Sequence, residues 1–180
     1  MQTIVLGPKF AIFAFEQKHW PMKAVFMIMA IVFSISIGAV NPVKVYKGTS
    51  VYNSDVICNV NGGKVYKKNS VYNSDVVCTV RENKIYKANS VYRSDVIFTI
   101  VDGKVYTGNS VYNSDIVMTI RDGKIYKGTS VYNSDIIATV RDGKVYSGTS
   151  VYNSDIAFTF NGNLTIEEFV AVWYAVFYAW

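Results

Sequence analysis

The sequence predicts a mainly β fold: six tandem 20-residue β-hairpin repeats in a closed or radial shallow barrel, with an apolar N-terminal segment and a C-terminal helix. Three observations lead to the mainly β class and the tandem hairpins. Residues 44–163 consist of six copies of one 20-residue unit. Twelve of the 14 Tyr occupy two fixed positions of that unit. Each copy also carries a two-residue turn signal between short apolar runs, which is typical of a hairpin.

The composition limits the class of protein and its partners. With 180 residues, 51% of them hydrophobic and 17% charged, the chain has enough apolar surface for one domain with tails. The net charge is +5, but residues 44–163 interleave 15 Lys and Arg with 10 Asp and Glu. This mixture indicates a solvated surface rather than a basic patch, and we expect no nucleic-acid partner.

Residues 1–43 are predicted to be a leader that directs the chain to or through a membrane. Met22-Lys23 precedes an apolar run, Ala24–Phe33, and small residues follow up to Ala39, which is the pattern of a signal peptide. On this interpretation the start is Met22, or residues 1–21 form a short cytoplasmic leader. The uncharged stretch 24–40 also reaches the lower limit of a membrane anchor. A buried core helix is the third alternative.

The fifth copy, residues 124–143, shows how the unit predicts a hairpin together with the start of the next copy. A strand begins at Ile136, and alternation places Ile136, Ala138 and Val140 on one apolar face. Asp142-Gly143 then predicts a type I′ turn, in which both central residues have positive φ. A second strand returns from Lys144 and brings Val145 opposite Val140. Residues 148–155 are rich in turn formers and form the connector to the next hairpin.

Charge and symmetry narrow the arrangement of the six hairpins. A stacked solenoid would align six Asp and six Lys in ladders of like charge about 4.8 Å apart, which is unfavourable. A propeller would have only three blades, and a trefoil would require odd and even copies to differ, which they do not. A radial or a linear array of hairpins remains.

The last segment, residues 164–180, changes to a helical pattern. Thr165 and Glu168 form a predicted capping box, and no face of the helix is polar after Glu168. Such a helix is buried in protein or in lipid. At roughly 1.5 Å per residue it spans about 24 Å, which is short for a bilayer. We therefore expect it to pack into or across the β-repeat, with membrane association as the alternative.

The repeats resemble a known family. Units such as Lys44-Val-Tyr-Lys-Gly-Thr-Ser-Val-Tyr-Asn-Ser-Asp-Val-Ile57 are similar to the short hairpin repeats of β-flower proteins. That resemblance covers residues 44–163. It implies a shallow symmetrical barrel with hairpin petals around an apolar channel, and a hydrophobic or lipid ligand. The segment 122–128 is also similar to MORN repeats, which form linear arrays, but their period is longer and they carry further Gly signals absent here.

The repeated polar and aromatic columns have a structural and a functional interpretation. The six Asp equivalent to Asp55 suggest a cation-binding ring, or more simply Asx-turns within the connectors. The Tyr column at 52, 72, 92, 112, 132 and 152 suggests a stacking surface for sugars or bases, or more simply core or inter-hairpin packing. Cys58 and Cys78 share a column with Phe98, Met118, Ala138 and Phe158, which predicts buried thiols rather than a disulfide.

The sequence favours a non-enzymatic, exported or membrane-associated β-repeat scaffold that binds an unidentified ligand, located outside the cell or in the cell envelope. The repeats lack His, and sixfold replication of Ser-Asp contradicts the asymmetry of a catalytic site. We predict no cofactor and no metal. The alternative is a carrier or sensor of a lipid-like ligand, in a channel gated by the helix. Its predicted ligand-binding residues are Phe169, Trp173, Phe177 and Trp180.

Overall fold

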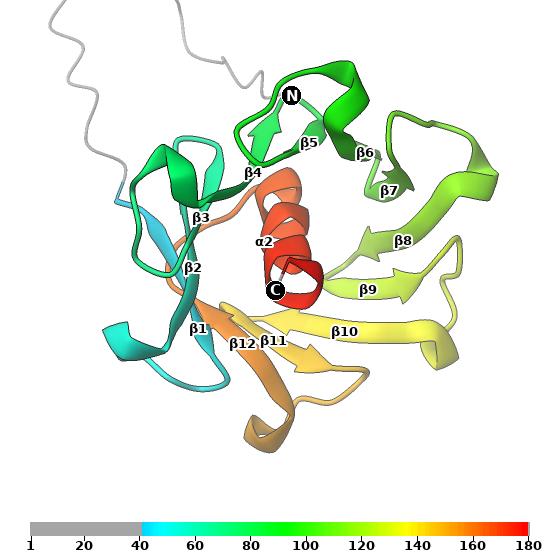
Figure 1. The fold of residues 1–180 in the computed structure, drawn as a ribbon. Coiled ribbons are helices and arrows are strands. Elements are labelled where there is room, and N and C mark those ends of the chain that lie inside the picture. The colour runs from blue at the N-terminus through cyan, green and yellow to red at the C-terminus, as the bar shows by residue number, and fades with distance from the viewer. Residues whose placement is uncertain (1–40, 180) are drawn as a thin grey trace, which may run out of the picture. The chain divides into compact units, whose positions relative to one another are not determined.

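The computed structural model describes residues 41–179. Within this range the chain forms a closed antiparallel barrel in which each strand pairs with its neighbours in sequence, and the last strand pairs with the first (Figure 1). The twelve strands are β1 (Val43–Lys47), β2 (Val56–Asn61), β3 (Lys64–Lys67), β4 (Val76–Arg81), β5 (Lys84–Lys87), β6 (Val96–Val101), β7 (Lys104–Thr107), β8 (Ile116–Arg121), β9 (Lys124–Lys127), β10 (Ile136–Arg141), β11 (Lys144–Ser147) and β12 (Ile156–Phe160). The predicted six-hairpin ring is confirmed. The predicted signal peptide or anchor, and Trp180, lie outside the described residues.

Each hairpin follows the predicted register. In the β10–β11 hairpin, Val140 pairs with Val145 and Arg141 with Lys144. Asp142 and Gly143 have φ of 51° and 70°, as a type I′ turn requires. The turn chemistry of the sequence therefore sets the local geometry of the hairpin.

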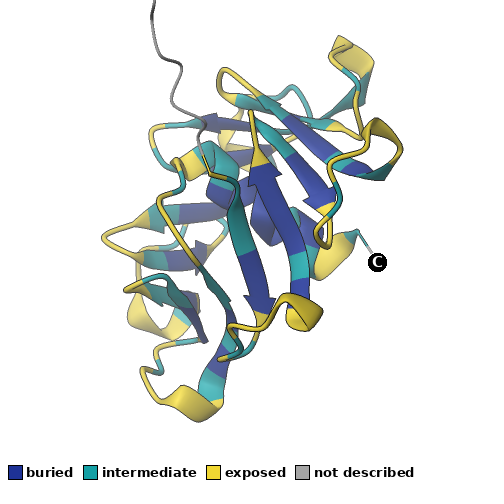
Figure 2. Cartoon of the chain, turned by 90° about the vertical axis from the view of Figure 1, so that its left-hand side faces the viewer, coloured by how far each residue is buried: buried dark blue, intermediate teal, exposed yellow. Residues whose placement is uncertain are grey.

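Between successive hairpins the chain forms a connector that ends in a single 3₁₀ turn. These turns are η1 (Asn53–Asp55), η2 (Asn73–Asp75), η3 (Arg93–Asp95), η4 (Asn113–Asp115), η5 (Asn133–Asp135) and η6 (Asn153–Asp155). The connectors extend away from the barrel like petals and carry most of the exposed surface (Figure 2). We call residues 51–54 of the first petal, and the equivalent residues of the others, the connector tips.

A β-bulge at the start of each long strand changes the predicted alternation. In β10 the register shifts so that Ile136 pairs with Tyr126 while Ala138 pairs with Ile125. Ala138 and Ile125 belong to the central core. Because paired residues point to the same face, Ile136 lies with Tyr126 on the outer face. The prediction that Ile136 shares the face of Ala138 is therefore wrong, and the inserted residue, Ile137, is the reason.

The outer face carries a second buried layer beneath the connectors. Tyr126 and Ile136 are 7% and 8% exposed. Next to them Thr119 is buried, and its Oγ1 donates a hydrogen bond to the carbonyl of Gly128 at 2.7 Å. The equivalent Thr hydroxyls on β4, β6, β10 and β12 bind connector carbonyls in the same way. These bonds fasten five connectors to their own hairpins, and at the equivalent position on β2 the Asn59 side chain donates to the Lys68 carbonyl at 2.8 Å and holds the remaining one.

The first and last strands of the repeat region pair with each other and close the barrel. β1 pairs with β12 through Val45 opposite Phe160 and Lys47 opposite Phe158. Beyond the strand, the amide N of Lys44 donates to Oδ1 of Asn161 at 2.6 Å, and the amide N of Asn161 donates to the Lys44 carbonyl at 3.1 Å. The sixth hairpin is thus assembled from two segments more than 100 residues apart in sequence.

The helix α2 (Ile166–Tyr178) lies inside the ring of strands (Figure 1). The predicted capping box at Thr165 and Glu168 is present. Val170, Ala171, Val172 and Ala175 are fully buried in one cluster with the inward-facing residues of the strands. The prediction that the helix packs into the β-repeat is confirmed. None of the helices in the described range, 41–179, is both long and apolar enough to cross a bilayer.

Candidate functional site

The aromatic residues predicted on the helix fill the barrel rather than line an open channel. Phe169 and Trp173 are each 7% exposed, whereas Phe177 is 46% exposed at the end of the helix. The ring centroids of Trp173 and Phe177 are 4.5 Å apart, and Phe177 also contacts Phe158 at 6.1 Å. The structure therefore places Phe169 and Trp173 in the core and Phe177 in contact with Trp173 at the exposed end of the helix, and Trp180 lies outside the described residues.

Trp173 has one feature that sequence reasoning did not find. Its Nε1 is buried and has no hydrogen-bond partner within residues 41–179. Buried indole N–H groups normally find an acceptor. This side chain is held in place by apolar packing alone, and its burial includes the desolvation cost of one polar group.

The Asp column stabilises the connectors. In the fourth petal, the Ser110 hydroxyl donates to Oδ2 of Asp115 at 2.5 Å and accepts from the amide N of Tyr112 at 3.1 Å. The amide N of Asp115 donates to the Tyr112 carbonyl at 2.9 Å. The Ser–Asp bond recurs in all six petals. The Asp column therefore stabilises the connectors, as the simpler interpretation expected. Each Asp does so by accepting a hydrogen bond from a Ser hydroxyl and not by forming an Asx-turn. Within the described range no three His, Cys, Asp or Glu lie together as metal ligands would.

The Tyr column at the connector tips is exposed, contrary to the expectation of packing. Its six side chains are 71–74% exposed, and the six Val that precede them are 48–75% exposed. The column equivalent to Tyr126 is the one that packs against the barrel. A 20-residue period does not distinguish these two columns, because both repeat perfectly. The Tyr126 column lies on paired strands beneath the connectors, whereas the Tyr132 column lies in the connectors themselves, just before each 3₁₀ turn.

The exposed Val–Tyr pairs are repeated without variation, unlike several other exposed positions of the unit. Lys47 on the strand edge is replaced by Thr107 and Ser147 in later copies, and Asn53 is replaced by Arg93. These positions are exposed and tolerate change. The Val–Tyr pair is equally exposed and never changes, although the barrel does not need it for packing. The tips are therefore the main candidate binding surface.

Grooves between neighbouring petals border the tips. One, with a volume of about 320 Å³, is lined by Pro42, Lys44, Asn53, Asn59, Asn69 and Val71. A second, of about 330 Å³, is lined by Lys84, Tyr86, Val91, Arg93, Val96 and Asn109. In each, a tip Val lies beside amide and cationic side chains. The grooves offer hydrogen-bonding groups next to an apolar contact.

The two cysteines are structural. Both are free and fully buried, as predicted. Burial raises the pKa of the Cys58 thiol from 9.0 to about 12, and burial also raises that of Cys78. A thiol whose ionisation is suppressed in this way is a poor nucleophile.

These features define a class of protein: a closed sixfold hairpin-repeat scaffold, stabilised by an internal helix, with repeated exposed tips. The comparisons agree with that class. A family model described as "6-fold beta flower protein" matches residues 45–173, and the chain belongs to this family. The resemblance noted in the sequence is confirmed, and the family is not a known family of enzymes. No curated protein and no solved structure matches the chain.

Proposed function

We propose that the protein is a non-enzymatic, exported or membrane-associated binding scaffold whose six connector tips bind a polysaccharide. One observation carries this proposal: six identical Val–Tyr pairs are held on the surface at 48–75% exposure in a closed ring. Large apolar side chains that stay exposed at the same place in all six copies are candidate contacts for a partner.

The chemistry of the tips suits a sugar. An exposed Tyr ring offers a flat apolar face and a polar edge, which match the C–H face and the hydroxyl-bearing edge of a pyranose ring. The tip backbone is fixed, because Ser110 binds both the Tyr112 amide and Asp115. Amide side chains such as Asn69 line the adjoining groove and supply donors and acceptors for hydroxyl groups. Little of the tip has to be ordered on binding, which favours affinity.

Sixfold repetition suits a polymer. A single exposed Tyr contributes little affinity alone, but a chain of repeated sugars can occupy several tips of one molecule. Linked weak sites raise overall affinity by roughly 10²–10⁴ without any new type of contact. The proposal therefore predicts strong binding to polysaccharides and weak binding to their monosaccharides.

The proposal is tested with the full chain against a panel of polysaccharides: cellulose, chitin, xylan, starch and peptidoglycan glycan strands. Isothermal titration calorimetry compares wild type with the triple variant Tyr72→Ala, Tyr112→Ala and Tyr152→Ala. The matched control replaces the same three Tyr with Phe, which keeps the rings. We expect affinity to fall at least about tenfold in the Ala variant and to be largely kept in the Phe variant. Failure of every polysaccharide to bind, or equal binding by the two variants, refutes the proposal.

Export is supported by the pattern Met22–Ala39, which has the charged, apolar and small-residue regions of a signal peptide. Mass-spectrometric sequencing of the protein from its native cells tests it. A new N-terminus near residue 40 supports export with cleavage, and a chain retained from Met22 in membranes supports an anchor. A soluble cytoplasmic protein that begins at Met1 contradicts both.

The second candidate is a carrier or sensor of a hydrophobic ligand. It is favoured by the position of α2 in the channel and by the Nε1 of Trp173, which a ligand acceptor would satisfy. Because α2 fills the channel, a lipid-like ligand would have to displace it. Native mass spectrometry of the full chain, and of a chain without residues 164–180, tests this function. A lipid bound to neither form contradicts it.

A further inference from the structure

One end of the barrel has a rim of lysines on its inner face. Lys47 pairs with Phe158 across strands β1 and β12, and Lys127 pairs with Met118 across β9 and β8. Phe158 and Met118 face the core, and directly paired residues point to the same side. The lysines therefore lie at the opening of the barrel where the connectors begin, in four of the six copies, with Thr107 and Ser147 in the other two. The rim lysines are Lys47, Lys67, Lys87 and Lys127, with Lys68 beside them, and all are exposed.

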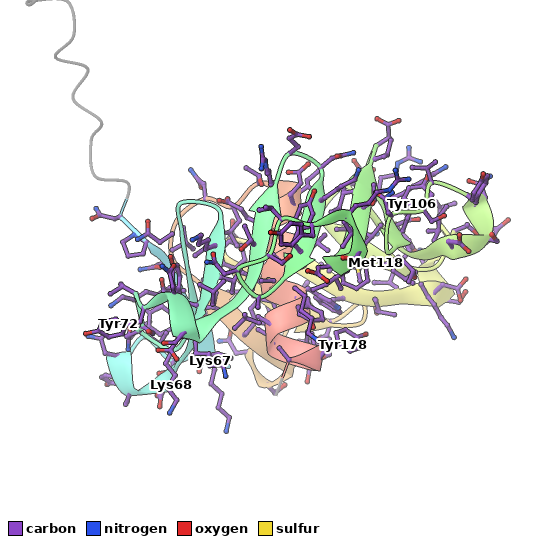
Figure 3. All side chains as sticks on the ribbon, turned by 45° about the horizontal axis from the view of Figure 1, so that its top comes forward. Lys67, Lys68, Tyr72, Tyr106, Met118 and Tyr178 are labelled. Carbon is purple, nitrogen blue, oxygen red and sulfur yellow. The ribbon has the colours of Figure 1, made fainter. Side chains whose placement is uncertain are left out.

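The helix α2 ends at this same opening. Phe169, in its first turns, contacts Phe160, which lies beside the hairpin turns. Phe177, in its last turn, contacts Phe158, the partner of Lys47. In Figure 3, Tyr178, Lys67 and Lys68 lie along the same lower side of the molecule. The helix thus runs from the turn end of the barrel to the lysine rim.

The centre of this end is apolar. Phe177 and Tyr178 are 46% and 66% exposed. Around them, the bulge residues of the strands are apolar in every copy, and Val117 and Ile137 are 38% and 39% exposed. We call this surface, from the helix end to the lysine rim, the barrel mouth. It combines an apolar centre with a basic border.

Charge distinguishes the barrel mouth from the opposite end. The positions equivalent to residues 47, 48 and 57 carry five Lys and no acidic residue in the six copies. The turn end mixes both signs, with ion pairs such as Arg121–Asp122 at 3.3 Å. The petal carboxylates nearest the mouth, such as Asp115, are already bonded to Ser hydroxyls. An apolar centre bordered by lysines is complementary to an anionic lipid surface.

We propose that the barrel mouth docks on an anionic membrane surface, with Phe177 and Tyr178 inserted at the headgroup level and the rim lysines against lipid phosphates and carboxylates. This inference concerns residues other than the connector tips, and neither site depends on the other. Each lysine near an anionic surface strengthens binding about fivefold, so three contribute on the order of 100-fold. The binding weakens with salt, because the lysine contribution is screened.

The experiment reports on the mouth itself, so that any attachment through residues 1–40 does not obscure it. The full chain carries Ala179→Cys labelled with a polarity-sensitive dye, and Cys58 and Cys78 stay unlabelled because they are fully buried. Vesicles of phosphatidylcholine alone are compared with vesicles that also contain phosphatidylserine. A label at Asn113→Cys, on a connector tip, is the control for non-specific adsorption. We expect a fluorescence rise only at position 179, and only with phosphatidylserine.

Two variants with equal net charge distinguish specific docking through the barrel mouth from a general electrostatic attraction of the protein to the vesicles. The mouth variant is Lys47→Gln, Lys87→Gln and Lys127→Gln; the control is Lys84→Gln, Lys104→Gln and Lys124→Gln on the outer face. The mouth variant should need on the order of 100-fold more lipid than wild type for half-maximal fluorescence. The lipid that the control variant needs should rise by a much smaller factor. Equal effects of the two variants, an equal response at Asn113→Cys, or no response to phosphatidylserine would overturn the proposal. Melting temperatures of the variants verify that each is folded.

Discussion

Removal of the Trp173 side chain tests whether α2 is an integral part of the core. The indole is 7% exposed. A buried Trp removes about 200 Å² from water, which corresponds to about 5 kcal/mol at 25 cal/mol per Å². Truncation of a core aromatic to Ala typically costs about 3–5 kcal/mol. Because Nε1 lacks a partner, its removal recovers about 1 kcal/mol of desolvation. We therefore expect Trp173→Ala to lower the free energy of unfolding by about 2–4 kcal/mol.

Guanidinium denaturation followed by circular dichroism measures this loss. Phe177→Ala on the same helix is the control, because that ring is 46% exposed and its truncation should cost only about 1–2 kcal/mol. Trp173→Phe keeps an aromatic ring and removes the N–H, so its cost should be below about 1 kcal/mol. The three variants together separate packing from polarity.

The cavity left by Trp173→Ala should bind a small aromatic molecule. Indole at ten times its dissociation constant would restore about 1.4 kcal/mol of stability to this variant. The wild type should gain nothing, because its channel is filled. The reasoning is refuted if Trp173→Ala costs no more than Phe177→Ala, or if indole stabilises wild type and variant equally. Either result would mean that α2 does not occupy the barrel in solution.

Three further changes test the turns, the petals and the core. Gly143→Ala would place a Cβ 2.7 Å from a backbone oxygen of the next strand and should lower the free energy of unfolding, measured by denaturant melts, by about 2–4 kcal/mol. Gly148→Ala, whose Cβ would be 3.9 Å from the nearest atom, should lower it by about 1 kcal/mol. Equal losses would contradict the turn geometry. Ser110→Ala should lower the free energy of unfolding by about 1–2 kcal/mol and should speed amide hydrogen exchange in its own petal only. Faster exchange in the other petals would show that the petals are not independent of one another. Because burial raises the pKa of Cys58 to about 12 and raises that of Cys78, neither thiol should react with iodoacetamide at pH 8 until guanidinium is added; rapid labelling of the native protein would show that the core opens.

The sequence was sufficient to predict what depends on neighbours along the chain. Asp142-Gly143 specifies a type I′ turn, and that turn fixes the pairing of Val140 with Val145. Thr165 and Glu168 likewise specify a helix start. These features are local, because a few adjacent residues determine the dihedral angles and hydrogen bonds involved.

What the sequence could not predict depends on residues far apart. Ile137 is the bulge residue because its neighbours Ile136 and Ala138 pair with two adjacent residues of β9, Tyr126 and Ile125. Alternation along the strand does not indicate this extra residue. The buried Tyr column lies on paired strands, and the exposed column lies in the connectors, just before each 3₁₀ turn. The expectation that the Tyr column at the connector tips is packed was wrong, because Tyr132 has the same period as Tyr126, yet one is 73% and the other 7% exposed. The lysine rim was missed because it exists only once the strands close into a ring.

The inner column of the barrel explains how a symmetrical repeat holds a single asymmetric helix. Six identical hairpins would form a channel with no preferred side. The column at Cys58, Cys78, Phe98, Met118, Ala138 and Phe158 is where the unit varies in side-chain volume. Two of its smaller members, Cys58 and Cys78, lie on β2 and β4, where α2 packs closest, and the Cys78 Sγ lies 3.7 Å from the Ala171 carbonyl oxygen.

On other strands, large members of this column meet the aromatic side chains of the helix. Phe98 contacts Tyr174 at 6.1 Å, and Phe158 contacts Phe177 at the same distance. Close packing requires side-chain volumes to match across an interface, so variation in this column sets the position and rotation of α2. The repeat keeps its exposed Val–Tyr pairs uniform, whereas the inner column that holds the helix varies in side-chain volume. One chain can therefore carry six identical Val–Tyr pairs at its connector tips and, at the same time, a single helix whose exposed end lies at the barrel mouth.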